Sequence, residues 1–182
     1  MTEEPYQPED AGALGMKALV EDLIVTDAFL IKGKVEGKFG RLSKVLEHYE
    51  KRFLVISSAT MVDLRRGDVI HTPRVHVNVD ELVLLHEFVD AGGDLYMQNL
   101  SVKGKNVRIR AFVHGVVNLE LAGMIRSGAY EAAGLDRGRF FVMEDCSVRG
   151  LEEGLARDFA PLSKMSYAII NSRKIAYIYD FS

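Results

Sequence analysis

Two similar stretches decide the fold of this chain: RFLVISSATMVDL at residues 52–64 and RFFVMEDCSVRGL at residues 139–151. Aligned without a gap, both begin with Arg-Phe, carry valine at the fourth place and end on leucine. Their apolar and small residues fall into similar columns, and β-branched and aromatic residues are typical of strands. We interpret the two stretches as the same strand in two copies of one unit.

Further matches extend this alignment in the same order along the chain. The offset between matched residues grows from 82 or 83 to 87 and then to 93. The added residues then fall in connecting loops, where insertions cost least. These matches predict an internal duplication; the alternative is chance likeness among strands of similar composition. The matched pairs are Phe29 with Phe112, Gly33 with Gly115, Arg52-Phe53 with Arg139-Phe140, Leu64 with Leu151, Asn78 with Asn171, Leu82 with Ile175 and Phe88 with Phe181.

Hydrophobic periodicity indicates the elements of each copy. In the first, we expect a strand at 27–37, a short helix of about three turns within 40–52, the strand at 52–64 and a hairpin at 74–88 that turns near Asn78 and Asp80. In the second, we expect a strand at 107–118, a helical or irregular segment at 121–135, the strand at 139–151 and a hairpin at 164–181.

The predicted fold is mainly β, of a β-rich α+β kind. A flexible tail at residues 1–15 precedes a first β-rich repeat at 16–91 and a second at 92–182, with AGGD at 91–94 as the linker. Each repeat is expected to form a small curled sheet or barrel with a short helix, because so small a sheet must curl or find a neighbour for its apolar face.

The two copies are expected to supply that neighbour to each other. Alternation in VRIRAFV places Val107, Ile109, Ala111 and Val113 on one face, with Arg108 and Arg110 on the other. The remaining predicted core residues are Phe53, Val55, Phe140, Val142, Leu82, Leu84, Ile175 and Tyr177.

The first copy resembles a known but uncharacterised bacterial family of small β domains. The residues concerned are GRLSKVLEHYEKRFLVISSATMV at 40–62 and VHVNVDELVLL at 75–85, within a match that covers about 32–88. The family pattern is a Gly-Arg-Leu-Ser helix start, a Phe-Leu strand and a Val-x-Val-Asn hairpin. The second copy departs from it, with GMIR at 123–126 in place of GRLS. More distantly, the arrangement is similar to Sm-like barrels. Neither resemblance implies a catalytic residue.

The composition excludes several classes of protein. The chain has 182 residues, of which 48% are hydrophobic and 27% charged, with a formal net charge of −3, so it is not disordered and has no global positive field. Cys146 is the single cysteine, which excludes an internal disulfide and fits a reducing compartment. The first residues lack the pattern of a signal peptide, and no apolar run reaches membrane-spanning length. We expect a cytoplasmic protein without a membrane partner.

No set of residues has the pattern of a catalytic site. His71, His76 and Asp80 could offer imidazole and carboxylate ligands to zinc or iron, but they match no compact metal motif. Cys146 stands where the first copy has Ala59, which favours a small buried residue over a nucleophile. We therefore predict no catalytic residue, no metal and no cofactor.

A basic cluster is the one local feature that suggests a ligand. SVKGKNVRIR holds Lys103, Lys105, Arg108 and Arg110 without an intervening acid, and alternate residues of a strand share a face that could follow phosphates. These four residues are the candidate anion or nucleic-acid contacts. The alternative is an ordinary charged face, which the net negative charge favours.

Together these observations predict a non-enzymatic binding or scaffolding protein that acts through β-rich repeat surfaces and self-associates as a dimer or ring, with a protein partner also possible. Two alternatives remain open. One is Sm-like binding of RNA through the basic strand, and the other is a metal-dependent enzyme centred on His71 and His76.

Overall fold

The computed structural model describes residues 21–38, 42–47, 49–88, 105–130, 139–151 and 160–181. Three predictions lie outside these ranges: the tail at 1–15, the linker at 91–94 and the placement of Lys103. In the described ranges no helix has the length and apolar character needed to cross a membrane. The elements are β1 (Asp22–Thr26), β2 (Phe29–Val35), α1 (Leu42–Glu47), β3 (Phe53–Asp63), β4 (Val69–Asn78), η1 (Val79–Glu81), β5 (Leu82–Glu87), β6 (Asn106–Val113), β7 (Leu119–Arg126), β8 (Phe140–Arg149), η2 (Ala160–Ser163), β9 (Met165–Asn171), η3 (Ser172–Lys174) and β10 (Ile175–Asp180).

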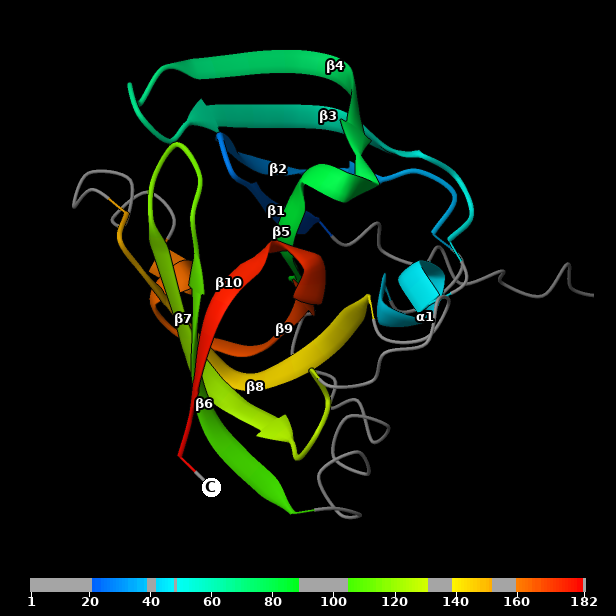
Figure 1. The fold of residues 1–182 in the computed structure, drawn as a ribbon. Helices are drawn as coiled ribbons and strands as arrows, with labels where there is room; N and C mark the ends of the chain where they lie inside the picture. Colours follow the sequence, from blue (N-terminus) through cyan, green and yellow to red (C-terminus); the bar gives the residue numbers. More distant parts are fainter. Residues whose placement is uncertain are drawn as a thin grey trace, which may run out of the picture.

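The protein is mainly β, and its ten described strands form one antiparallel sheet in the order β10-β6-β7-β8-β9-β5-β1-β2-β3-β4 (Figure 1). We call β1–β5 the first block and β6–β10 the second block. In both, the fifth strand lies beside the first, and the order is fifth, first, second, third, fourth. The blocks meet where β5 pairs with β9, a contact that we call the seam. At the two ends of the sheet lie β4 and β10, and no other described strand pairs with their outer sides, which we call the open edges.

Strand pairing in the two blocks follows the same register. Val25 pairs with Leu84 in the first block as Phe112 pairs with Tyr177 in the second. Lys34 pairs with Ser57 as Met124 pairs with Glu144. Phe53 pairs with Asn78 as Phe140 pairs with Asn171, and Ala59 with Thr72 as Cys146 with Met165. The sequence matches at residues 52–64, 139–151, Asn78 and Asn171 are therefore also matches of position in the sheet, and Cys146 occupies the place of Ala59.

Both blocks bulge at the same point of their second and third strands. The register shifts between Lys32 and Lys34 in one block, and between Ala122 and Met124 in the other. Opposite each shift stands a non-glycine residue with positive φ, Ser58 at 51° and Asp145 at 48°. A side chain in place of the glycine at each shift would clash, because its Cβ would lie 2.6 Å from a neighbouring atom at both Gly33 and Gly123.

Three sequence predictions for this region are wrong. Gly33 corresponds in register to Gly123, not to Gly115. Phe29 lies on β2 whereas Phe112 lies on β6, a first strand, so these two do not correspond either. The segment at 121–135 is not helical at its start, because Leu119–Arg126 forms β7, with every second residue buried. Glycine and alanine on that strand weaken its alternation in the sequence.

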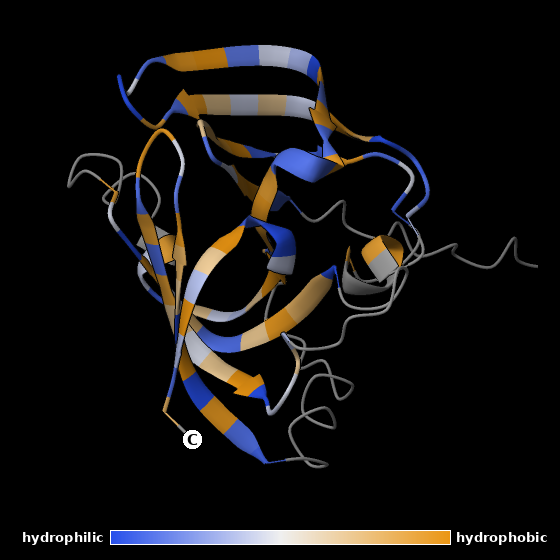
Figure 2. Cartoon of the chain, viewed as in Figure 1, coloured by the Kyte–Doolittle hydropathy of each residue, from blue (hydrophilic) through white to orange (hydrophobic). Residues whose placement is uncertain are grey.

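Apolar and polar residues alternate along β6 (Figure 2). The hydrophobic core consists of two clusters, and each of them draws on both blocks. One fills the inside of the second block, where Val107, Ile109, Ala111 and Val113 are buried as predicted, and it includes Leu23, Leu30 and Val83 of the first block. The other fills the inside of the first block, with Leu42 and Leu46 of α1, and includes Tyr167 and Ile169 of β9. The apolar contacts of each block therefore extend across the seam.

Two predicted core residues are instead exposed. Leu82 and Leu84 are fully buried, as expected, but 43% of Phe53 and 62% of Tyr177 are open to solvent. Both lie at the ends of the sheet, Phe53 beside the edge strand β4 and Tyr177 on the edge strand β10. Of the helix of about three turns predicted within 40–52, the structure describes six residues, as α1.

Candidate functional site

The seam is an edge-to-edge contact between two strands that are far apart in the chain. Leu84 pairs with Ile170, and Leu85 pairs with Ile169. All six residues of β5 are buried, and so are all but one of the seven residues of β9. This burial shows that β5 is covered on its faces as well as at its edge.

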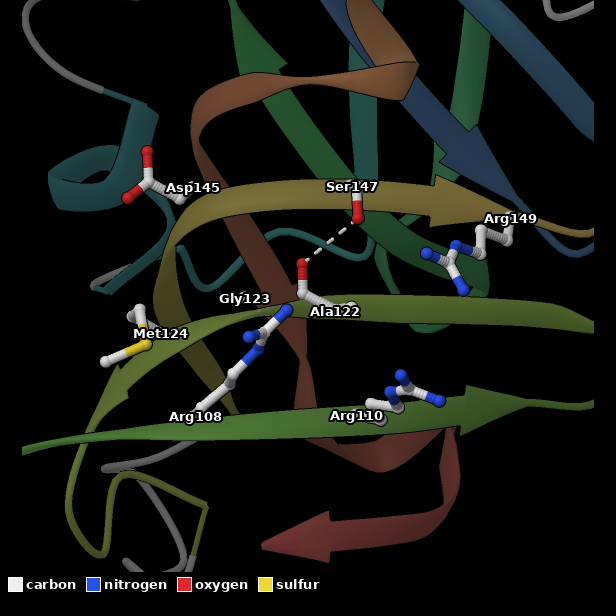
Figure 3. A pocket seen from close by; sticks show the side chains of 8 residues that line it. All are labelled: Arg108, Arg110, Ala122, Gly123, Met124, Asp145, Ser147 and Arg149. Carbon is white, nitrogen blue, oxygen red and sulfur yellow. Dashed lines mark hydrogen bonds between the residues drawn. The ribbon is translucent and has the colours of Figure 1, made fainter. Parts of the chain in front are cut away.

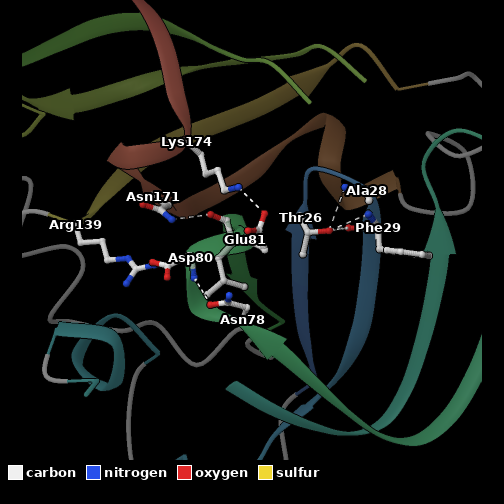
Figure 4. A network of polar contacts seen from close by, with 10 residues as sticks. Thr26, Ala28, Phe29, Asn78, Asp80, Glu81, Arg139, Asn171 and Lys174 are labelled. Carbon is white, nitrogen blue, oxygen red and sulfur yellow. Dashed lines mark hydrogen bonds and ion pairs between the residues drawn. The ribbon is translucent and has the colours of Figure 1, made fainter. Parts of the chain in front are cut away.

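A polar network joins the two blocks at the η1 and η3 end of the seam (Figure 4). The Nδ2 of Asn171 donates a hydrogen bond of 2.8 Å to the carbonyl oxygen of Leu82, and both groups are buried. Its Oδ1 accepts a bond from the backbone N–H of Arg173, as Asn78 Oδ1 accepts one from Asp80 in the first block. Two ion pairs cross here, Lys174 with Glu81 at 2.6 Å and Arg139 with Asp80 at 2.5 Å.

A buried group of charges lies at the other end of the seam. The Nζ of Lys38 lies 2.7 Å from Asp22 Oδ1 and 2.6 Å from Glu87 Oε1. From β9, the hydroxyl of Tyr167 donates to Glu87 Oε2 at 2.7 Å. The helix contributes the N–H of Leu42, which donates to Glu87 Oε1 at 3.0 Å. Helix, β1, β5 and β9 are thus tied together at one point.

The two carboxylates in this group have opposite pKa shifts. Burial raises the pKa of Asp22, and the hydrogen bond from Lys38 offsets only part of that effect. Burial alone would also raise the pKa of Glu87, but hydrogen bonds from Lys38 and Tyr167 outweigh it, and the pKa is lowered. Lys38 therefore lowers the pKa of both carboxyls against the effect of their burial.

The open edges carry aromatic and aliphatic side chains that face solvent. On and beside β10, Tyr177 and Tyr179 are each 62% exposed and Phe181 is 58% exposed. On β4, Val69 and Ile70 are also exposed. These are the strands that correspond in register to β5 and β9, whose residues are buried in the seam.

Two of the sequence-predicted basic residues, Arg108 and Arg110, lie on the outer face of the second block. Arg108 and Arg110 of β6 line a pocket of about 280 Å³ together with Arg149 and Ser147 of β8 (Figure 3). Lys105, which precedes β6, is exposed and does not line this pocket. The structure thus brings two of the four predicted residues together.

An acidic side chain belongs to the same surface. Glu120 Oε1 lies 3.5 Å from Arg110 Nε and 3.9 Å from Arg149 Nη1. Sequence reasoning did not predict Arg149 and Ser147 as part of this pocket. They lie on β8, and only β7, which was not predicted as a strand, brings β8 close to β6. The signal that could have found them is the alternation at 119–126.

The other candidates form no site in the described part of the chain. No group of three His, Cys, Asp or Glu side chains that could hold a metal ion occurs among the described residues. His71 bonds to Thr60, and Asp80 pairs with Arg139. Cys146 is fully buried, and burial raises the pKa of its thiol to about 12, so it is a small core residue, as predicted.

Comparison of the chain with protein-family models, with curated proteins and with solved structures finds no match.

Proposed function

We propose that this chain is a non-enzymatic binding and scaffolding protein, built by duplication of one five-strand unit, that works through the edges of its sheet. The observation that carries the proposal is the seam, in which a strand edge of one block binds a strand edge of the other. The common register of the blocks supports duplication, with the units at residues 16–91 and 92–182.

The open edges are suited to binding because, among the strands that the structure describes, each has backbone groups on one side that no other strand pairs, together with exposed apolar side chains. An exposed strand edge is a template for another strand, and natural proteins usually protect such edges with charges, proline or bulges. Tyr177, Tyr179 and Phe181 at β10 do the opposite, since they add apolar area to the edge. Addition of a strand at an edge is a common mode of protein recognition. A cytoplasmic location fits this role and leaves Cys146 as a thiol.

The proposal can be tested by affinity purification of tagged chains from native lysate. Tyr177→Glu with Tyr179→Glu places charges on the β10 edge, and Arg65→Glu at the exposed turn after β3 serves as the control. We expect the wild type and the control to retain partners, whether copies of the chain or other proteins, that the edge variant loses by roughly tenfold or more, which corresponds to about 1.4 kcal/mol. Equal retention by all three proteins would contradict the proposal.

A second candidate function is binding of nucleic acid, which the arginine-lined pocket favours. Arg108, Arg110 and Arg149 converge on one hollow of the outer face, where guanidinium groups could contact successive phosphates. Glu120 between them reduces the local positive charge, so we rank this function second.

This second function predicts binding that depends strongly on salt, because each neutralised phosphate releases counterions. Arg108→Glu with Arg110→Glu should weaken binding of single-stranded RNA and reduce the salt slope by roughly two. Arg65→Glu with Arg66→Glu makes the same change in net charge at the β3–β4 turn and should have little effect. No binding at low salt, or equal loss in both variants, would exclude the pocket as the site.

A further inference from the structure

We propose that β10 of one copy of the chain pairs antiparallel with β4 of a second copy, so that the seam is repeated between chains and copies join head to tail. This inference rests on the proposed binding through sheet edges and names the partner. Within one chain, the fifth strand of the first block pairs with the fourth strand of the second. The two strands at the ends of the sheet are β10, the fifth strand of the second block, and β4, the fourth strand of the first block. They correspond to β5 and β9, the two strands that pair in the seam.

The common register of the blocks fixes which residues should meet. Leu84 corresponds to Tyr177, and Ile170 corresponds to Val77. The seam pair Leu84 with Ile170 therefore predicts Tyr177 opposite Val77 of the second copy. In the same way, the pair Leu85 with Ile169 predicts Ile178 opposite His76.

Burial is the first reason to choose a second copy as the occupant. Leu84 is fully buried in the seam, whereas Tyr177 in the corresponding place is 62% exposed. Tyr179 is equally exposed, although its counterpart His86 is only 7% exposed. Leu84 packs in the cluster that fills the second block, so a seam repeated between chains would cover Tyr177 with the first block of the second copy and would remove its apolar area from water.

Polar side chains give the second reason, because the contacts of the seam have counterparts at the open edges. Tyr167 and Glu87, which bond in the seam, correspond to Arg74 and Asp180, which have opposite charges. Within one chain Arg74 pairs with Glu36 and Asp180 accepts a hydrogen bond from Tyr130, so a contact between chains would add to these bonds or exchange with them. Asn171, which donates to the Leu82 carbonyl, corresponds to Asn78.

At the η1 and η3 end of the proposed contact the charges are mixed. Glu81 and Lys174 correspond to each other, so their opposite charges would face each other between chains, but the two already pair within each chain at 2.6 Å and add no new partner. One like-charged pair also arises, Arg52 with Arg173, in place of Asp80 with Arg139. Both of these arginines are exposed, so the cost is small.

Pro73 sets a limit on the pairing. Proline has no N–H to donate and is tolerated in a sheet only where a ladder bond is not needed. It precedes Arg74, which is the last residue that the predicted register pairs with β10, opposite Asp180. The proposed ladder of backbone hydrogen bonds therefore ends at Arg74, one residue before it would reach Pro73.

A contact of this kind is heterologous, because it joins two different edges. Each added copy presents a new open β10 or β4, so the assembly closes as a ring if the rotation between copies permits and otherwise grows as a chain. In either case its mass is a whole multiple of 20.3 kDa.

Engineered cysteines test the register directly. Cys146 is fully buried, so thiols placed on the edges would be the reactive ones. In purified protein carrying both His76→Cys and Ile178→Cys, mild oxidation should give covalent dimers and larger species. Each single variant should stay monomeric under denaturing conditions, whereas a mixture of the two should give dimers. As a control out of register, Ile70→Cys with Ile178→Cys should not cross-link, because residue 70 lies six places along the strand, about 20 Å away.

Light scattering across a dilution series gives an independent measurement that needs no cysteine. The wild type should exceed the monomer mass at high concentration, and Tyr177→Glu with Tyr179→Glu should be monomeric with an unchanged circular dichroism spectrum. A monomer at every concentration overturns the inference, and so does cross-linking of Ile178→Cys alone, which would mean a symmetric contact between two β10 strands.

The two proposals can fail separately. If the purified chain stays monomeric while the wild type still captures partners from lysate that the edge variant loses, another protein occupies the edges, and only the head-to-tail inference falls. If the purified chain stays monomeric and the edge variant captures the same partners from lysate as the wild type, both proposals fail.

Discussion

The seam and the open edges are the same kinds of strand in two different surroundings. β5 and β10 have the same place in their blocks and the same pairing with a first strand, yet every residue of β5 is buried and most of β10 is exposed. The sequences differ accordingly, LVLLHE in β5 and IAYIYD in β10. The difference teaches that burial of a strand depends on what lies beyond its edge and faces. Tyrosine, with an apolar ring and a polar end, suits an edge strand that faces solvent.

The largest expected effect comes from removing the charge at one end of the seam. Lys38→Met leaves Asp22 and Glu87 buried without their cation, and loss of one partner from a buried ion pair costs about 3–5 kcal/mol. Urea unfolding at pH 7 measures this loss in the free energy of unfolding. Lys32→Met is the control, because Lys32 pairs with Glu21 at an exposed site and its loss should cost under about 1 kcal/mol.

The pH dependence of Lys38→Met sharpens this test. Without Lys38, burial raises the pKa of both carboxyls, so the folded state takes up protons more readily than the unfolded state. Stability of the variant should then rise relative to the wild type as the pH falls from 7 to about 5. In the wild type, the lowered pKa of Glu87 makes a contribution of the opposite sign, which is lost as the pH falls through that pKa. If the difference in free energy of unfolding between wild type and variant stays the same as the pH falls, Lys38 stabilises the protein by packing alone.

A pair of truncations compares corresponding positions of the two fifth strands. Leu84→Ala opens a cavity in a fully buried place and should cost about 2–5 kcal/mol. Tyr177→Ala removes a side chain that is mostly in water and should change the stability of the monomer by no more than about 0.5 kcal/mol. Both are measured by urea unfolding at the lowest workable protein concentration. Equal losses would contradict the description of β10 as an open edge.

The two asparagines at the ends of the fourth strands form a closer comparison. Asn78→Ala removes the bond to the N–H of Asp80 and should cost about 1 kcal/mol. Asn171→Ala removes the corresponding bond to Arg173 and also leaves the buried Leu82 carbonyl without its donor, so about 2–3 kcal/mol is expected. Chemical unfolding gives both values. If the two losses are the same, the bond across the seam contributes nothing measurable.

The smallest expected effect is at the ion pairs that cross the seam near the surface. Lys174→Met should lower the free energy of unfolding by no more than about 1 kcal/mol, because its partner Glu81 is half exposed. Salt titration of the wild type and the variant measures the electrostatic part, since screening should reduce the difference between them. A much larger loss would show that the pair is coupled to the rest of the network.

Sequence reasoning identified the features that depend on local pattern. The strand at 52–64, the ends of strands at Asn78 and Asn171, and the small buried place of Cys146 each follow from periodicity or from turn chemistry within a few residues. The predicted hairpins at 74–88 and 164–181 are wrong, because β4 does not pair with β5 and β9 does not pair with β10. A short polar turn between two apolar strands shows where the chain turns but not which strands then pair. β7 was missed because its glycine and alanine weaken the apolar alternation, and without it neither Gly123 nor Arg149 could be assigned to its place.

The pairing of β5 with β9 in the seam could not be predicted from local sequence pattern. The sequence predicted that two copies bury their faces against each other, which accounts for Leu84 but places Phe53 and Tyr177 in a core. The residues that pair in the seam lie about half the chain apart, so no local pattern shows which edge pairs with which. The sequence of an apolar strand has the same pattern whether or not another strand pairs with its edge.

The seam also sets an order for the synthesis of the chain. When β1–β5 have left the ribosome, β9 (Met165–Asn171) has not yet been synthesised. Until it is, the edge of β5 that pairs with β9 in the folded protein has no partner strand. An exposed apolar edge of this kind is where nascent chains pair wrongly with one another. We therefore expect a fragment truncated before β9 to expose this edge and to aggregate.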